Sequence, residues 1–341
     1  MTTNLLQHVI SQAQQGHDLS MEEMASAVGS IMQGECPAED IANLLLALRD
    51  KGESVDEVAG AAQAMRSHMQ KITSQRGDLL DTCGTGGDGS NTFNISTAAA
   101  IVTAAAEVPV AKHGNRSISS KSGSADVLAE LGVNVNADLS TVERCLDEVG
   151  ICFCFAPLAH PAMKHVAAVR KKLAIPTIFN ILGPLCNPAG APFQLLGVGR
   201  PALRSLMAAA LQQLGTRRAL VVCGEDGMDE VTLSGNTHVT EVIGSDLQEH
   251  TWSPSSFGLE MQSKESMIVD GPSASANMIR DVLSGQIGPS RDIVVLNAAA
   301  ALWVAGKHES TSQCAHLAAQ AIDSGRANEV LARLVELSHR E

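Results

Sequence analysis

The sequence predicts an α/β protein with a small all-helical N-terminal domain and a large α/β domain built on a mainly parallel central sheet. Residues 1–72 carry only helical patterns, whereas short apolar runs alternate with helical stretches from Gly77 onward. The 341 residues are enough to bury one large core and a smaller one. We therefore expect a small domain at 1–72, joined by the helices near 162–184, and a large domain at 73–341.

The helical unit carries its own start and stop signals. Ser20–Glu23 and Ser54–Glu57 fit the capping box, in which a hydroxyl and a carboxylate satisfy free N–H groups at a helix start. Pro37 suits a first helical turn, and glycines fall where helices should stop. About four helices are therefore expected, with breaks at Gly16, Gly34 and Gly52.

The large domain is expected to alternate strands and helices, which places helices on both faces of a parallel sheet. One helix is predicted over Ile95–Val108, and a later one ends at Gly132. Ser253–Gly271 is the least patterned stretch, so irregular or antiparallel elements are expected there. The apolar runs predicted as strands are Leu79–Leu80, Pro109–Ala111, Ile151–Phe155, Leu195–Val198, Ala219–Cys223 and Ile293–Leu296.

Composition argues against several classes of protein. The net charge is −13 and aromatic residues make up 2%, so neither a phosphate-tracking surface nor a base-stacking platform is expected. Eight cysteines are scattered along the chain, and the first residues lack the basic and apolar parts of a secretory signal. No apolar run in the sequence has the length needed to cross a membrane. We expect a cytoplasmic protein with neither nucleic acid nor membrane as a partner.

Residues Asp81–Ser96 form the most informative run, DTCGTGGDGSNTFNIS. Glycines let backbone N–H groups turn toward one point, and the N-terminus of the following helix would face the same anion. The run predicts a phosphate or diphosphate cradle, with a capped glycine-rich turn as the plainer alternative. Asp88 within the run suggests that a metal or ribose hydroxyls share the site. Further side-chain donors are Asn94, Ser96 and Thr97.

A second polar run, Lys112–Ser124 (KHGNRSISSKSGS), follows a predicted strand and is expected to form a strand-end loop. Its composition is that of a second phosphate pocket, against the alternative of a flexible polar surface loop. The cations are Lys112, His113, Arg116 and Lys121. The neutral donors are Asn115, Ser117, Ser119, Ser120 and Ser122, with Gly114 and Gly123 for backbone approach.

A third run, DGMDE at Asp226–Glu230, directly follows the apolar run Ala219–Cys223. Adjacent carboxylates at a strand end suit Mg²⁺, which takes one or two carboxylates together with phosphate oxygens and water. A solvated acidic turn is the alternative when the run is taken alone. Two anion pockets in the same chain favour the metal interpretation, with Asp229 and Glu230 as ligands.

The fourth run, His160–Lys172 (HPAMKHVAAVRKK), predicts a helix that starts at Pro161. Arg170 near its end would hold a substrate carboxylate, bidentately where the geometry allows. Favourable placement of basic residues at a helix C-terminus explains the same pattern equally well. His160 and His165 do not have the HExxH spacing of a zinc-binding helix.

Taken together, these runs resemble the anthranilate phosphoribosyltransferase family. The resemblance covers nearly the whole chain, with minor departures at Ser117, Ile118 and Cys186. It implies a dimer in which the helix bearing Arg170 belongs to the small domain, so that the active site lies between the two domains. The runs that carry it are Asp81–Thr97, Lys112–Leu131, His160–Pro188 and Asp226–Glu230.

The resemblance implies a transferase of tryptophan biosynthesis. The amine of anthranilate would attack C1 of 5-phosphoribosyl diphosphate, giving N-(5-phosphoribosyl)anthranilate and diphosphate. Two Mg²⁺ ions per monomer would accompany the diphosphate. A homodimer is implied, and an anthranilate synthase amidotransferase is a candidate partner.

Roles for individual residues follow from the same resemblance. Ser96, Asp229 and Glu230 would hold magnesium. Gly84, Asn115 and Arg170 would contact anthranilate, and no residue is implied as an acid, base or nucleophile. The residues implied to bind phosphoribosyl diphosphate are Gly84, Gly87, Asp88, Thr92, Asn94, Ile95, Ser96, Thr97, Lys112, His113, Gly114, Asn115, Arg116, Ser117, Ile118, Ser119, Ser120 and Ser124.

Two rival functions share this architecture. A pyrimidine nucleoside phosphorylase would need a nucleoside pocket and inorganic phosphate, and the DTCGTGGDG and DGMDE runs argue against it. A non-enzymatic relative that binds nucleic acid is opposed by the negative charge and the scarcity of aromatic residues.

Overall fold

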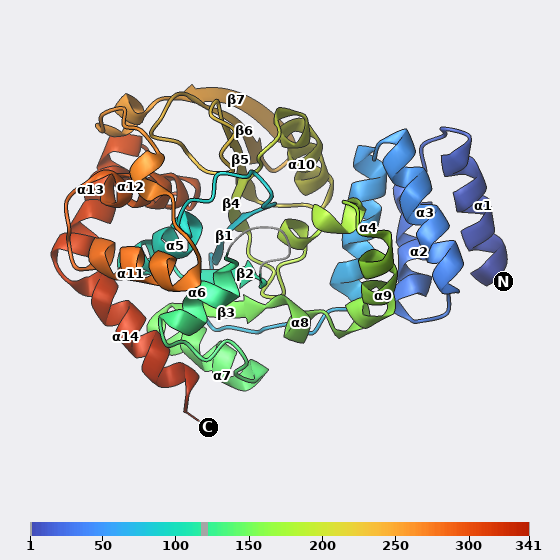
Figure 1. Ribbon diagram of the computed structural model, residues 1–341, viewed down its shortest axis with the longest axis horizontal. Coiled ribbons are helices and arrows are strands. Elements are labelled where there is room, and N and C mark those ends of the chain that lie inside the picture. The colour runs from blue at the N-terminus through green and yellow to red at the C-terminus, as the bar shows by residue number, and fades with distance from the viewer. Residues whose placement is uncertain (1, 117–121, 341) are drawn as a thin grey trace.

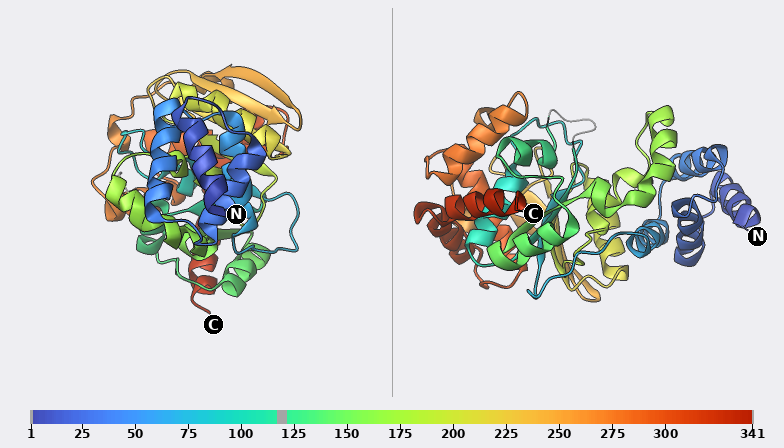
Figure 2. Two further views of the ribbon diagram at one scale, coloured as in Figure 1. Left: turned by 90° about the vertical axis from the view of Figure 1, so that its right-hand side faces the viewer. Right: turned by 90° about the horizontal axis from the view of Figure 1, so that it is seen from below.

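The computed structural model describes residues 2–116 and 122–340, and the chain begins with a helical bundle. Figure 1 shows the bundle in blue beside the rest of the chain, and Figure 2 shows it at one end of the long axis. The bundle consists of α1 (Thr2–Gln14), α2 (Met21–Met32), α3 (Ala38–Lys51) and α4 (Val55–Ser67). The predicted all-helical N-terminal unit is therefore confirmed.

Both predicted capping boxes are present in the bundle. The Ser20 and Ser54 side chains accept the backbone N–H of Glu23 and Glu57, whose carboxylates accept the N-cap N–H in return. The predicted helix stops are also confirmed, because the glycines there take the left-handed conformation that glycine adopts without strain. Their φ values are +80° at Gly16, +78° at Gly34 and +87° at Gly52.

A seven-stranded sheet in the order β3-β2-β1-β4-β5-β6-β7 forms the centre of the large domain. Its first five strands in chain order run parallel, and β6 and β7 are antiparallel additions at one edge. The predicted mainly parallel sheet is thus confirmed. The strands are β1 (Leu80–Gly84), β2 (Val110–Gly114), β3 (Ile151–Phe155), β4 (Phe193–Gly197), β5 (Arg218–Gly224), β6 (Thr237–Ile243) and β7 (Asp246–Trp252).

Helices cover both faces of this sheet. On one face, α5 (Ile95–Ala105) contacts β1 and β2, and α12 (Pro289–Val304) contacts α5, β4 and β5. On the other face, α10 (Pro201–Gln213) lies between β5–β6 and α4 of the bundle. The remaining helices are α6 (Ser124–Glu130), α7 (Leu139–Arg144), α8 (Ala156–Ala159), α9 (Lys164–Leu173), α11 (Pro272–Leu283), α13 (Thr311–Asp323) and α14 (Arg326–Ser338).

Two buried clusters follow from the alternation of side chains along the strands. Leu195 of β4 and Leu220 of β5 belong to the cluster under α5 and α12. Leu196 and Val221, the next residue along each strand, belong to a second cluster that includes α10 and the helical bundle. One core therefore lies inside the large domain, and the other runs from the sheet into the bundle.

The strand predicted at Ile293–Leu296 is wrong. These residues lie in α12, where they are fully or almost fully buried. A short apolar run cannot distinguish a buried strand from a buried helix by periodicity alone. Pro289 at the first helical position and the apolar residues that continue to Val304 are the signals that favour a helix here.

Ser253–Gly271 contains only 3₁₀ turns, at Pro254–Phe257 and Glu265–Met267, and one isolated antiparallel bridge between Thr92 and Ile268. The expectation of irregular or antiparallel elements is confirmed for this stretch. The hairpin of β6 and β7 just before it was not predicted. Among the described residues, no helix is long and apolar enough to cross a membrane.

Candidate functional site

The candidate site lies at the carboxyl ends of four neighbouring parallel strands in the order β2-β1-β4-β5. The chain moves from β1 to β2 and β3 on one side and then returns to β4 on the other, so the strand order reverses between β1 and β4. Ligands of open α/β sheets bind at such switch points. All four strands end in a glycine, namely Gly84, Gly114, Gly197 and Gly224.

These glycines make room for loops that fold over the strand ends. A Cβ at Gly84 would lie 2.4 Å from Asp229 Oδ2, and a Cβ at Gly197 would lie 1.6 Å from the Asp229 carbonyl oxygen. At Gly114, a Cβ would lie 2.1 Å from Ser124 Oγ. Side chains at the first two positions would displace Asp226–Glu230, which we call the carboxylate turn. The sequence predicted glycine for anion approach but not for this packing, and Gly197 was missed altogether.

Residues 85–94, which we call the glycine loop, connect β1 to α5 and bend at three glycines with positive φ, Gly86, Gly87 and Gly89. The Gly86 N–H donates to Asp229 Oδ2 at 3.0 Å, which joins the glycine loop directly to the carboxylate turn. The structure therefore brings the first and third predicted runs together. Predicted ligands on the loop and the first turn of α5 are Gly87, Asp88, Thr92, Asn94, Ile95, Ser96 and Thr97.

Some predicted donors at the start of α5 are already engaged. Thr97 Oγ1 donates to Asn94 Oδ1, and the Asn94 N–H donates to Ser275 Oγ at 2.9 Å. Ile95 is 1% exposed and its N–H bonds to the Phe93 carbonyl, so its side chain belongs to the core.

The carboxylate turn gathers negative charge beside the glycine loop. Burial and, second, the nearby charge of Asp88 raise the pKa of Asp229 to about 7. Burial and the charge of Asp229 also raise the pKa of Glu230, whose carboxylate accepts a hydrogen bond from the Ser96 N–H. Partly buried carboxylates that repel one another favour a bound cation.

This set of residues fits magnesium better than a metal that needs a closed protein cage. Among the described residues, no group of three or more His, Cys, Asp or Glu side chains is arranged to hold a metal ion. Mg²⁺ needs only one or two carboxylates when phosphate oxygens and water supply its other ligands. Asp229 and Glu230, with Ser96 beside them, provide that set.

Lys112 is placed differently from the expectation. The sequence put it in a loop, but Lys112, His113 and Gly114 are the last residues of β2. Lys112 is 3% exposed, and its Nζ donates to the Thr82 carbonyl at 2.6 Å and to Ser96 Oγ at 3.1 Å. Burial lowers the pKa of Lys112, and the carboxylates around it, Asp81 foremost, oppose that shift. Its ammonium group thus supports Ser96 from inside the protein.

The second predicted run continues beyond β2 from Asn115. Arg116 forms an ion pair with Asp126 at 3.0 Å and lies 5.8 Å from the Phe155 ring centre, while Ser124 begins α6. The exposed Asn115 accepts the Arg116 N–H with its side-chain oxygen at 2.7 Å. Ser117, Ile118, Ser119 and Ser120, predicted as ligands, lie outside the described residues, as does Lys121.

A pair of buried histidines was not predicted as a unit. The rings of His113 and His160 lie 5.2 Å apart, and the Nε2 atom of each is buried without a hydrogen-bond partner in the part of the chain that the structure describes. Burial lowers the pKa of His113 to about 4 and that of His160 to about 3, so both are neutral at pH 7. Spacing in the sequence gave no signal for this pair, because the residues come from separate elements.

Arg170 lies on α9, which packs against α2 and α3 of the bundle. Its Nη2 donates to Asn180 Oδ1 at 3.4 Å, and its guanidinium lies 5.8 Å from the Phe179 ring centre. Burial lowers the pKa of Arg170. Its contacts are therefore on the bundle side of the molecule, whereas the glycine loop and carboxylate turn belong to the sheet (Figure 1).

Asn297 was also missed by the sequence. This fully buried residue of α12 accepts the Val231 N–H and donates to the Val231 carbonyl, both at 2.9 Å. It fixes the backbone immediately after Glu230. A lone asparagine inside an apolar helical run was the available signal, because a buried amide needs partners.

Comparison with known proteins agrees with this architecture. Residues 7–69 match the model of a glycosyl transferase family, helical bundle domain, and residues 76–328 match that of a glycosyl transferase family, a/b domain. The chain is 50% identical over 327 residues to an anthranilate phosphoribosyltransferase of Rhodopirellula baltica, covering 96% of each chain. It is 47% identical over 335 residues to one of Acetivibrio thermocellus, covering 98% of this chain and 97% of the other.

Solved structures give the same result. Anthranilate phosphoribosyltransferase from Thermus thermophilus matches with a TM-score of 0.92 and 41% identity, over 97% of this chain and 99% of that one. The Saccharomyces cerevisiae enzyme in complex with PRPP and Mg matches with a TM-score of 0.90 and 29% identity, over 98% of both chains. The chain therefore belongs to the glycosyl transferase family defined by these two domains and, within it, to the anthranilate phosphoribosyltransferases.

Proposed function

We propose that this protein transfers the 5-phosphoribosyl group of phosphoribosyl diphosphate to the amine of anthranilate, giving N-(5-phosphoribosyl)anthranilate and diphosphate in tryptophan biosynthesis. The observation that carries the proposal is the hydrogen bond between the Gly86 N–H and Asp229, which joins a phosphate-type glycine loop to a pair of adjacent carboxylates. Such a pairing suits a metal-bound diphosphate. A nucleoside phosphorylase or a nucleic-acid-binding relative would not need it.

The diphosphate end of the donor would lie over the glycine loop and the start of α5. Backbone N–H groups there and the helix N-terminus favour negative charge. Magnesium, two ions per monomer, would be held by Ser96, Asp229 and Glu230, where it would neutralise the diphosphate leaving group. Lys112 would keep Ser96 in place through its hydrogen bond to Ser96 Oγ. The remaining donor ligands are those that the sequence implies, from Gly84 to Ser124.

Anthranilate would approach from the bundle side of the site. Arg170 would bind its carboxylate, while Gly84 and Asn115 would contact the acceptor near the ribose. Bond breaking at C1 leaves an oxocarbenium-like ribose, so positioning of two substrates and charge stabilisation account for the catalysis. We assign no acid, base or nucleophile.

The same proposal extends to assembly and domains. The chain would form a homodimer, with 1–72 and the helices near 162–184 as the small domain and 73–341 as the large one. A reducing cytoplasm suits its eight free cysteines. An anthranilate synthase amidotransferase is a candidate partner.

One assay tests the function directly. The protein is mixed with anthranilate, phosphoribosyl diphosphate and Mg²⁺, and the loss of anthranilate fluorescence is followed. Fluorescence should fall only when all three are present. A parallel sample with a pyrimidine nucleoside and inorganic phosphate should release no base. Persistent anthranilate fluorescence at high enzyme concentration would defeat the proposal.

A further inference from the structure

The segment Gln262–Val269 connects the two parts of the candidate site, the glycine loop and the carboxylate turn. On one side it pairs with the glycine loop, because the Phe93 N–H donates to the Met267 carbonyl at 2.9 Å and the Val269 N–H donates to the Asn91 carbonyl at 3.0 Å. On the other side, the Gln262 N–H donates to the Leu233 carbonyl at 2.9 Å, just beyond the carboxylate turn. This segment belongs to the stretch that carried no pattern in the sequence.

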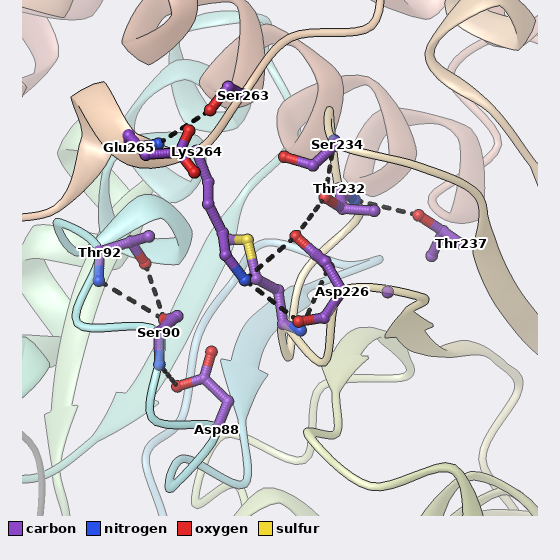
Figure 3. Close-up of polar contacts among 12 residues, drawn as sticks. Asp88, Ser90, Thr92, Asp226, Thr232, Ser234, Thr237, Ser263, Lys264 and Glu265 are labelled. Carbon is purple, nitrogen blue, oxygen red and sulfur yellow. Dashed lines mark hydrogen bonds and ion pairs between the residues drawn. The ribbon is translucent and has the colours of Figure 1, made fainter.

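Lys264 extends from this segment to the first residue of the carboxylate turn. Its Nζ donates to the Asp226 carbonyl at 3.1 Å and lies 3.6 Å from Asp226 Oδ2. The Asp226 side chain is 14% exposed, so the ion pair is partly shielded from water. Figure 3 shows the Lys264 side chain reaching Asp226, with Ser90 and Thr92 of the glycine loop on its other side in that view.

Asp226 in turn shapes the carboxylate turn. Its Oδ1 accepts the Met228 N–H at 3.3 Å, and its Oδ2 accepts the Thr232 hydroxyl at 3.0 Å. The far end of the turn is fixed separately by the two hydrogen bonds between Val231 and Asn297. Asp229 and Glu230 therefore lie on a turn that is held at both ends. Lys264 contacts Asp226 at its start, and Asn297 bonds to Val231 directly after its end.

We propose that Lys264 is a positioning residue for the metal and diphosphate end of the site. It connects the carboxylate turn, which bears Asp229 and Glu230, to the segment that pairs with the glycine loop. The distance between the carboxylate turn and the glycine loop is thereby fixed. The inference rests on the proposed function, because it concerns the binding of magnesium and phosphoribosyl diphosphate.

The test compares three variants. Lys264→Met removes the charge but keeps most of the apolar stem, and Lys264→Arg restores a cation. Lys307→Met is the matched control, because Lys307 forms an ion pair with Glu107 at 3.4 Å and its side chain is 32% exposed, against 29% for Lys264. Each variant is titrated with MgCl₂ at fixed phosphoribosyl diphosphate, and KM is measured for both substrates.

Lys264→Met should raise the Mg²⁺ concentration for half-maximal rate and the KM for phosphoribosyl diphosphate by about tenfold, as loss of an outer-shell partner commonly does. The KM for anthranilate should stay within about twofold in all variants. Lys264→Arg should recover most of the loss, and Lys307→Met should match the wild type. An unchanged magnesium titration, or equal changes in both KM values, would overturn the inference.

A second readout is independent of turnover. MgCl₂ with phosphoribosyl diphosphate should raise the Tm of the wild type, and this ligand-dependent rise should be smaller for Lys264→Met. An equal rise in both proteins would also overturn the inference. The wild type could show the rise in Tm with MgCl₂ and phosphoribosyl diphosphate and yet never consume anthranilate. In that case the proposed function fails, while the comparison of Tm values still decides the role of Lys264 in binding.

Discussion

Single residues set the specificity proposed for this site, and Arg170 is the one with a test of its own. Its guanidinium lies beside Asn180 and Phe179 and has no carboxylate partner among the described contacts. Arg170→Ala should raise the KM for anthranilate by about 10–100-fold, the worth of one charge-assisted hydrogen bond. The KM for phosphoribosyl diphosphate should change little. Steady-state kinetics measure both, with the exposed Lys171→Ala on the same helix as control; equal losses for both substrates would remove Arg170 from the acceptor pocket.

The buried histidine pair makes stability depend on pH. Because the folded pKa values are about 4 for His113 and about 3 for His160, the unfolded chain, with ordinary values near 6.5, binds more protons between those limits. The free energy of unfolding should therefore fall as the pH drops below about 6.5, by up to about 1.4 kcal/mol per pH unit for each histidine.

Urea unfolding of His160→Gln between pH 4.5 and 7.5 checks this slope. The variant should lose less stability on acidification than the wild type, whereas His17→Gln, at an exposed position, should keep the wild-type slope. Parallel curves for His160→Gln and the wild type would contradict the assignment. Other groups contribute to acid unfolding, so the comparison rests on the difference between the variants.

At the scale of helices and strands, the two capping boxes offer a matched pair. Glu57 is fully buried and accepts the Leu19 N–H at 3.0 Å, the Ser54 N–H at 2.8 Å and Lys51 Nζ at 3.0 Å. Glu57→Ala should cost about 3 kcal/mol, because it leaves two backbone donors without this acceptor and takes from Lys51 one of its two carboxylate partners, the other being Asp18. Glu23→Ala in the more exposed box should cost about 1 kcal/mol.

Chemical denaturation of the two variants gives the comparison directly. Similar losses in the free energy of unfolding would mean that Glu57 acts only as a helix cap. A much larger loss for Glu57→Ala is expected because its carboxylate also joins the start of α4 to the loop before α2 and to the end of α3.

The predictability of the elements differs with the range of their interactions. Capping boxes, glycine stops and the strand Ile151–Phe155 depend on neighbours in sequence, and all were predicted correctly. The helix α12 was taken for a strand because its burial is decided by the sheet beneath it. Likewise the glycine loop and the carboxylate turn could each be predicted from their own sequence runs. The roles of Asn297 and Lys264 could not, because both residues contact parts of the chain that are distant in sequence.

At the scale of the whole molecule, the helical bundle and the sheet share a buried core. Leu45 of α3, Leu196 of β4 and Met207 of α10 belong to one cluster of buried side chains. The bundle therefore does not have a separate hydrophobic core. Substrates bound between Arg170 and the glycine loop would span this junction. We therefore expect the wild type to unfold in a single calorimetric transition.

Arg66 of α4 is one polar link across this junction, and the hydrogen bond from Gln213 of α10 to Asp56 of α4 is another. Arg66 Nε donates to the Leu185 carbonyl at 2.6 Å and its Nη1 to the Leu214 carbonyl at 3.4 Å, and burial lowers the pKa of Arg66. Arg66→Met keeps the stem but leaves the Leu185 carbonyl without this charged donor, which should cost about 2 kcal/mol. The variant should show a lower Tm and a bundle transition that separates from that of the sheet domain. The exposed Arg49→Met on α3 should unfold as the wild type does. An unchanged single transition in Arg66→Met would mean that Arg66 is not needed to couple the two parts.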